Sequence, residues 1–162
     1  QSVARAATTF VGQNLGNGNV ERAKKGVRSA LLISMATTVI LMVPVLLFAP
    51  DLTAFFNAKP EVIRYGTLLL RWLSPFYILC CVNQVYAGAL RGAGNSQVPM
   101  ILMLSSFVVF RQCYLYVMSH FICNEVLPIA LSYPAGWIVR SVATLLYYRR
   151  AKLDKTTLVN DL

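Results

Sequence analysis

The chain has 162 residues, of which 57% are hydrophobic and 13% are charged, and its formal net charge is +9. Soluble domains carry about 25% charged residues, so this composition excludes an ordinary soluble domain and is typical of a membrane protein. The positive charge does not indicate nucleic-acid binding, because the basic residues form no single stripe interleaved with aromatic residues.

Long apolar runs separated by short polar breaks organise the chain. The acidic residues all fall in these breaks: Glu21, Asp51, Glu61, Glu125, Asp154 and Asp161. An apolar run of about 20 residues can cross a bilayer as a helix. The sequence therefore predicts an all-α, polytopic membrane helical bundle over residues 1–150, followed by a polar cytoplasmic tail. The predicted elements are the end of one span at 1–15, complete spans at about 27–49, 62–90, 98–121 and 126–148, and the tail at 151–162.

The first breaks follow from glycine, asparagine and proline. Gly16-Asn-Gly-Asn19 is expected to end the first segment, since both residue types terminate helices. Val20 to Gly26 is predicted to be a charged link, and Pro50 to Pro60 a loop at the opposite membrane face. Pro44 is expected to kink the second span, where neighbouring groups can satisfy the freed carbonyl.

The break between the third and fourth spans is rich in glycine. Gly92 and Gly94 permit the unusual backbone dihedrals of a tight turn. Asn95 and Ser96 are expected to cap the next helix. Pro99 suits the first turn of that helix, where its missing N–H costs nothing.

A glycine pattern occurs twice. Gly12-x-x-x-Gly16-x-Gly18-Asn19 recurs as Gly88-x-x-x-Gly92-x-Gly94-Asn95, each time at the end of a predicted span. Such glycines can terminate helices or let two helices pack closely in lipid. We favour termination and assign structural turns to Gly16, Gly18, Gly92, Gly94 and Pro99, and we leave close packing open.

The basic residues in the breaks gather on one side of the predicted bundle. That side holds Arg22, Lys24, Lys25, Arg28, Arg91, Arg149, Arg150, Lys152 and Lys155, whereas the opposite breaks hold only Lys59 and Arg64. Cytoplasmic loops are enriched in such residues, which predicts a multi-pass protein of the plasma or inner membrane with a cytoplasmic C-terminus. The chain begins with Gln1 and no signal peptide leads it, so we expect a fragment whose N-terminal part is missing.

Arg111 is the charged residue near the middle of the fourth span. A central membrane arginine is costly to insert and usually faces a bundle interior or water. Tyr114 shares its helical face. Arg111 can therefore be a cation that lines or gates a pathway, or a structural arginine bonded to carbonyls or to an acid of another helix.

Asn83 and Gln84 are amides in the uncharged part of the third span, and Tyr77 lies on the face of Gln84. Amides in lipid usually bond across helices, which we favour over contact with a substrate or ion. Tyr133, Trp137, Arg140 and Thr144 form another face, for which packing is favoured over stacking on a flat organic cation. The sequence shows no catalytic constellation and no metal-ligand cluster. It therefore predicts no enzyme, no cofactor and no metal site.

Two segments, Phe10 to Lys24 and Gly88 to Met100, together resemble the C-terminal lobe of the multidrug and toxic compound extrusion (MATE) family. Arg111 and Tyr133-Pro-x-x-Trp137 are also similar to that family's pattern. The resemblance implies a fold of twelve spans in two six-helix lobes. Residues 1–15 would be the end of the eighth span, and the missing N-terminal lobe would be the partner.

The resemblance also implies export of cationic or drug-like small molecules in exchange for H⁺ or Na⁺ by alternating access. Some members use an acidic residue inside this lobe for coupling, and the spans predicted here contain none. Coupling through a carboxylate is therefore expected in the missing part. Alternatives are a flippase for lipid-linked saccharides, disfavoured by the few arginines expected to face a cavity, and a non-transporting membrane scaffold or truncated product.

Overall fold

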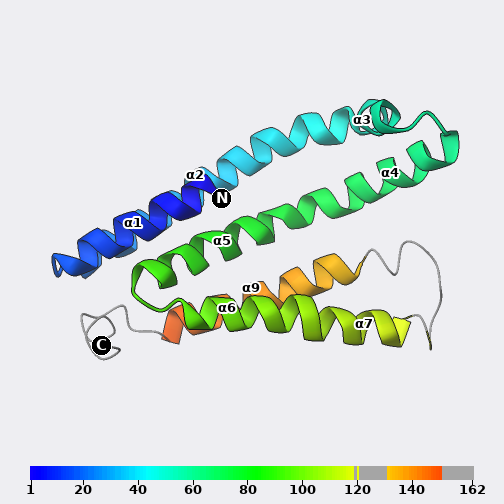
Figure 1. The fold of residues 1–162 in the computed structure, drawn as a ribbon. Helices are drawn as coiled ribbons and strands as arrows, with labels where there is room; N and C mark the ends of the chain where they lie inside the picture. Colours follow the sequence, from blue (N-terminus) through cyan, green and yellow to red (C-terminus); the bar gives the residue numbers. More distant parts are fainter. Residues whose placement is uncertain (119, 121–130, 151–162) are drawn as a thin grey trace.

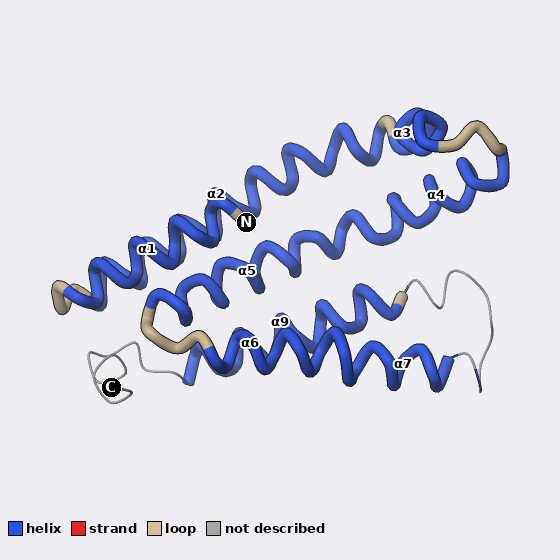
Figure 2. The backbone as a smooth tube through the Cα atoms, viewed as in Figure 1, coloured by secondary structure: helices blue, strands red, loops and turns tan. Residues whose placement is uncertain are grey.

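The computed structural model describes residues 1–118, 120 and 131–150, and every regular element within them is helical (Figure 1). This confirms the all-α class. The elements are α1 (Ser2–Gly16), α2 (Val20–Leu47), α3 (Ala49–Phe56), α4 (Pro60–Leu73), the 3-10 turn η1 (Ser74–Phe76), α5 (Tyr77–Gly92), α6 (Gln97–Leu104), the π-helical segment η2 (Ser105–Phe110), α7 (Arg111–Val117) and α9 (Ser132–Arg150). Among the described residues, the loops lie at the ends of helices (Figure 2). The predicted tail and the predicted start of the last span near residue 126 lie outside the described residues.

The second span begins earlier than predicted. The expected charged link from Val20 to Gly26 forms the first turns of α2 instead. The reason is local: the side chain of Asn19 accepts a hydrogen bond from the backbone N–H of Arg22 at 3.2 Å, which caps the helix. Lys25 and Glu21 then pair at 3.4 Å one turn apart.

The expected loop from Pro50 to Pro60 is largely helical. Residues 49–56 form α3, with Pro50 in its first turn, where proline is tolerated. The hydroxyls of Thr53 and Thr67 lie 3.1 Å apart and tie α3 to α4. The aromatic side chains of Phe55 and Phe56 at the end of α3 are exposed.

The third and fourth spans are each interrupted inside. The third is α4 and α5 joined through η1, where Pro75 cannot donate a helical hydrogen bond. The fourth is α6 and α7 joined through η2. Within the described residues, three helices are long and apolar enough to cross a membrane: Val20–Leu47, Pro60–Gly92 and Gln97–Val117.

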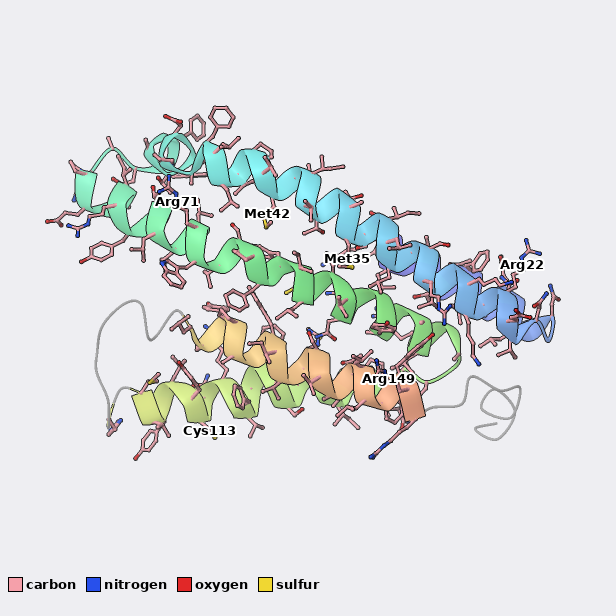
Figure 3. All side chains as sticks on the ribbon, turned by 180° about the vertical axis from the view of Figure 1, so that it is seen from behind. Arg22, Met35, Met42, Arg71, Cys113 and Arg149 are labelled. Carbon is pink, nitrogen blue, oxygen red and sulfur yellow. The ribbon has the colours of Figure 1, made fainter. Side chains whose placement is uncertain are left out.

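The helices run antiparallel, and their basic ends meet on one side. The α1–α2 turn, the α5–α6 turn and the end of α9 lie together at one end of the bundle (Figure 1). Arg22 and Arg149 project there, whereas Arg71 lies toward the other end (Figure 3). In the third span, Arg71 and Arg91 enclose an uncharged stretch.

Alanine, valine and leucine side chains form the centre of the packing between α1, α2 and α5. The buried cluster consists of Val11, Leu15, Ala23, Val27, Val85, Ala89 and Ala93. Many large side chains instead point outward, including Leu32, Ile40, Leu41 and Leu47, which are each more than 60% exposed. Large apolar side chains on the outer surface of the bundle are expected of helices that lie in lipid.

The two copies of the glycine pattern close their helices in the same way. The backbone N–H groups of Asn19 and Asn95 donate to the carbonyls five residues earlier, at 2.8 and 3.0 Å. Gly18 and Gly94 take positive φ angles of 73° and 88°, which glycine adopts without strain. The turn interpretation therefore holds at the later glycine of each copy.

The earlier glycines of the second copy allow close helix packing, which corrects the emphasis on termination. A Cβ atom on Gly88 would lie 2.5 Å from the carbonyl oxygen of Ala4, and one on Gly92 would collide with that of Thr8. Both carbonyls belong to α1, so α1 and α5 approach backbone to backbone. Gly16, in contrast, ends α1 with open space around it.

The start of α6 is capped by one of the two residues expected to do so. The side chain of Asn95 accepts a hydrogen bond from the backbone N–H of Val98 at 3.2 Å, and it donates one to the Tyr147 hydroxyl at 2.7 Å. Ser96 forms no side-chain cap bond. Pro99 lies buried in the first turn of α6. Asn95 therefore fixes the α5–α6 turn against α9.

Candidate functional site

Two adjoining cavities open into the bundle. The basic cavity, of about 660 Å³, lies between α1, α5, α6 and α9. The apolar cavity, of about 510 Å³, lies between α1, α2 and the α4–α5 rod. Gln84 lines both, as do Gln1 and Ala4, so the cavities meet at this point of α5 and α1.

Three arginines line the basic cavity. Arg5 comes from α1, Arg91 from the end of α5 and Arg140 from α9. The other polar lining groups are the side chains of Gln1, Thr8, Thr9, Gln84 and Ser96. No Asp or Glu side chain is among the described residues that line this cavity. Its wall is therefore positively charged.

Arg140 is the buried member of the three. Its side chain is 8% exposed, and its Nε atom has no hydrogen-bond partner among the described residues. The guanidinium lies 5.7 Å from the centre of the Phe107 ring. Arg5 and Arg91 are exposed, so Arg140 anchors the deep end of the cavity wall and the other two lie nearer its opening.

Beside this wall, Asn83 forms a buried polar network between α5 and α9. Its side-chain amide donates to the Ser141 hydroxyl at 3.4 Å and accepts from the Thr144 hydroxyl at 3.0 Å. Ser141 in turn donates to the backbone carbonyl of Leu79 at 3.2 Å. Asn83 is 3% exposed. This is the cross-helix bonding that the sequence favoured for an amide in lipid.

Gln84, the next residue, points differently. It lines both cavities, and no hydrogen bond of its side chain occurs within the described residues. Tyr77 lies two turns earlier on α5, lines the apolar cavity and packs its ring 5.4 Å from that of Trp137. The structure thus brings Gln84 and Tyr77 to one cavity and separates them from Asn83.

The apolar cavity has one polar contact across it. The Thr38 hydroxyl and the Cys81 sulfur lie 2.7 Å apart and connect α2 to α5. Both residues line the cavity, together with Leu41, Met42 and Val45 of α2. Sequence patterns gave no signal for this contact, because neither residue is unusual in an apolar run.

Arg111 and Tyr114 lie outside both cavities. The Arg111 guanidinium stacks over the Tyr133 ring at 4.0 Å from its centre, so it faces α9. Its Nε atom is buried without a hydrogen-bond partner among the described residues. Tyr114 packs beside Phe110, with ring centres 6.4 Å apart. Arg111 instead lines a separate small pocket together with Phe107, Tyr133 and Gly136. The choice between its structural and its pathway-lining role stays a prediction.

The basic cavity was missed by reasoning from the sequence. Arg140 was grouped with aromatic residues of the last helix, and Arg91 was assigned to the basic breaks on the predicted cytoplasmic side. The available signal was that Arg5 and Arg140 are among the arginines inside predicted spans, where each needs a polar environment. Within the described residues, no group of three or more His, Cys, Asp or Glu side chains could hold a metal ion.

These features define a class: an all-α, multi-pass membrane protein with a polar cavity among its spans. The MatE family model matches residues 1–117. A probable multidrug resistance protein NorM of Thermotoga maritima is 28% identical over 153 residues, which cover 94% of this chain and 33% of that protein. The chain therefore spans about a third of the length of this relative.

Solved structures share the fold. An outward-facing multidrug resistance MATE family transporter of the MOP superfamily matches 91% of this chain, and 32% of its own, with a TM-score of 0.79 and 22% identity. An inward-facing one matches 91% of this chain, and 34% of its own, with a TM-score of 0.82 and 21% identity. The chain belongs to the MatE family, whose members are transporters and not enzymes.

Proposed function

We propose that the chain forms part of one lobe of a secondary active multidrug efflux transporter, which exports drug-like organic molecules in exchange for H⁺ or Na⁺. The observation that carries this proposal is the pair of adjoining cavities, of about 660 and 510 Å³, inside a bundle of the MatE fold. Pockets of this size suit drug-sized ligands. The similarity to multidrug resistance proteins supports the export of such compounds.

Alternating access is the mechanism we propose. The fold of this chain is similar both to an outward-facing and to an inward-facing transporter, with TM-scores of 0.79 and 0.82. A lobe whose fold persists in both states can rock as a rigid unit about a central site. The partner would be a second lobe, and the spans of this lobe would lie in a plasma or inner membrane with lipid around them.

The basic end of the bundle is proposed to face the cytoplasm. Arg22, Lys25, Arg91 and Arg149 belong to the helix ends and turns on that side. Positively charged residues favour the cytoplasmic face. The C-terminus would then also be cytoplasmic, since α9 ends there.

The coupling ion needs a group that this part of the chain does not supply. Within the described spanning helices, no Asp or Glu lines either cavity. A carboxylate that exchanges H⁺ or Na⁺ would therefore belong to the partner lobe. Organic cations, the substrates that the resemblance predicts, would have to rely on that lobe or on aromatic rings such as Tyr77.

Transport by the complete protein, reconstituted in vesicles, tests this proposal. An imposed proton or sodium gradient is expected to drive accumulation of a fluorescent drug such as ethidium, and collapsing the gradient with an ionophore is expected to stop it. Accumulation that ignores both gradients would contradict secondary active transport. A scaffold without transport activity would give no accumulation under any gradient.

The charge of the basic cavity bears on the flippase alternative. The scarcity of arginines had disfavoured polyanionic lipid-linked saccharides, and the basic cavity removes that objection. Substrate-dependent thermal stabilisation by ethidium or by a lipid-linked sugar distinguishes the two functions.

A further inference from the structure

We infer that the basic cavity binds the anionic group of a substrate, a carboxylate or a phosphate on an amphipathic organic molecule. The inference rests on the proposed transport function and names the substrate class of the same site. It differs from the resemblance, which implies cationic substrates.

The first step is the charge of the cavity wall. Arg5, Arg91 and Arg140 come from three helices and converge on one cavity of about 660 Å³. Within the described residues, the ion pair observed is Lys25 with Glu21, on the exposed start of α2. The three arginines therefore have no carboxylate partner in this part of the chain. A cationic substrate would be repelled by them, and an anion would be attracted.

Arg140 is buried and lacks a hydrogen-bond partner at its Nε atom among the described residues. An arginine that is 92% buried normally satisfies its N–H groups with carbonyls or carboxylates, because an unpaired buried charge is costly. Its Nε has no partner here, and its exposure is 8%. A guanidinium offers two parallel N–H groups that match the oxygens of a carboxylate or phosphate. Such a ligand would supply the partner that the described residues do not.

Other polar side chains surround the arginines in the basic cavity. Thr8, Thr9, Gln84 and Ser96 line the same cavity and can donate hydrogen bonds to anionic oxygens. Met100 and Met103 of α6 line its remaining side and accommodate apolar surface. An anionic group held on an apolar body therefore matches the lining better than an inorganic ion does.

Two xanthene dyes of similar size and opposite charge test the inference. Binding of fluorescein, an anion, and of rhodamine 6G, a cation, is measured by fluorescence anisotropy on the complete transporter in phosphatidylcholine nanodiscs. Fluorescein is expected to bind at least about tenfold more tightly than rhodamine 6G. Its Kd is expected to rise with ionic strength, because the attraction is electrostatic and near an opening.

Substitutions locate the binding. Arg140→Gln and Arg91→Gln are each expected to raise the Kd for fluorescein about tenfold or more, since hydrogen bonds to charged groups are among the strongest. Arg140→Lys is expected to raise the Kd for fluorescein by a smaller factor, because lysine keeps the positive charge. Some affinity is still lost, because lysine lacks the two parallel N–H groups of arginine. The matched control is Arg149→Gln, which changes an exposed arginine of the same helix outside the cavity. Arg91 is exposed, so its variant remains informative if Arg140→Gln fails to fold.

The outcomes separate this inference from the proposed function. Rhodamine 6G binding that weakens as much as fluorescein binding in Arg140→Gln and Arg91→Gln, no binding of fluorescein, or an unchanged Kd for fluorescein in both variants would overturn the anion site. Gradient-independent accumulation would overturn secondary active transport and leave the binding preference standing. Phosphatidylglycerol in the nanodiscs distinguishes the source of the anion: competition with fluorescein would assign the site to a lipid headgroup, and no competition to a soluble substrate.

Discussion

At the scale of single residues, the adjacent amides Asn83 and Gln84 of α5 have different surroundings. Asn83 is buried and bonded to Ser141 and Thr144 of α9, whereas Gln84 lines the cavities. The sequence showed two adjacent amides in an apolar run and could not separate them. The separation follows from the position of α9, which lies about 60 residues away along the chain and is not visible in local periodicity.

These positions give a paired prediction. Asn83→Ala is expected to lower the free energy of unfolding by about 1–2 kcal/mol, because it removes two buried hydrogen bonds and leaves the Thr144 hydroxyl without its acceptor. Gln84→Ala is expected to change stability by less than about 0.5 kcal/mol and to weaken substrate binding. Thermal unfolding in detergent and a binding isotherm measure the two effects. Unchanged substrate affinity in Gln84→Ala would reduce Gln84 to a contact between helices.

Arg111 was recognisable from the sequence as a charge inside a span, but its partner was not. The structure places its guanidinium 4.0 Å from the centre of the Tyr133 ring, between α7 and α9. Neither cavity includes it. A pairing of a cation with an aromatic ring depends on which helices are neighbours, and one sequence does not give that information.

Arg111→Ala is expected to abolish efflux at normal expression, because it removes the stacking of a charged group of α7 on the Tyr133 ring of α9 within the fourth span. Tyr133→Phe keeps the ring and is expected to keep efflux. Drug resistance of cells that express the complete transporter measures both variants, with membrane abundance as the control. Retained resistance in Arg111→Ala would remove Arg111 from the functional residues.

At the scale of elements, the sequence predicted the spans better than their interiors. The long runs of apolar residues indicated where the membrane-spanning helices lie, because a segment in lipid must satisfy its backbone hydrogen bonds within a continuous helix. The short helix α3, the early start of α2 and the π-helical segment η2 were not predicted. Ser105 and Ser106 both donate to the carbonyl of Leu102, at 3.3 and 2.7 Å. This competition for a backbone acceptor accompanies the wider turn, and apolar periodicity contains no sign of it.

The close approach of α1 and α5 gives a prediction at this scale. Gly88→Ala is expected to cost about 1–3 kcal/mol of stability, because its Cβ atom would lie 2.5 Å from the Ala4 carbonyl oxygen and push α1 away. The control is Gly16→Ala, where no atom lies within 4 Å and the expected change is under about 0.5 kcal/mol. Unfolding midpoints in detergent compare the two variants. Equal midpoints would show that the helices can separate without cost.

At the scale of the whole molecule, the sequence predicted the sidedness of the basic breaks, and the bundle brings these ends together. The α1–α2 turn, the α5–α6 turn and the end of α9 share one end. The cavities were beyond the sequence, because their walls combine residues of helices that are distant along the chain.

Membrane orientation can be measured directly. Cysteines introduced as Lys25→Cys and Arg149→Cys are expected to react with an impermeant maleimide only from the cytoplasmic side. Lys59→Cys, before α4, is expected to react only from the other side. The unsubstituted protein controls for the four native cysteines, Cys80, Cys81, Cys113 and Cys123. Labelling of positions 25 and 149 from opposite sides would contradict the packing of α1, α2 and α9.

The uncharged stretch between Arg71 and Arg91 has a consequence for the choice of host bilayer. Twenty residues of helix rise about 30 Å, which equals the usual hydrocarbon thickness. The two guanidinium groups are therefore expected to lie at the two boundaries of a hydrocarbon layer of this thickness. In a bilayer of longer acyl chains, the α4–α5 helix has to straighten or the bilayer around it has to become thinner. In a bilayer of shorter acyl chains, the helix has to tilt. Turnover should consequently peak in bilayers of intermediate chain length and fall on either side.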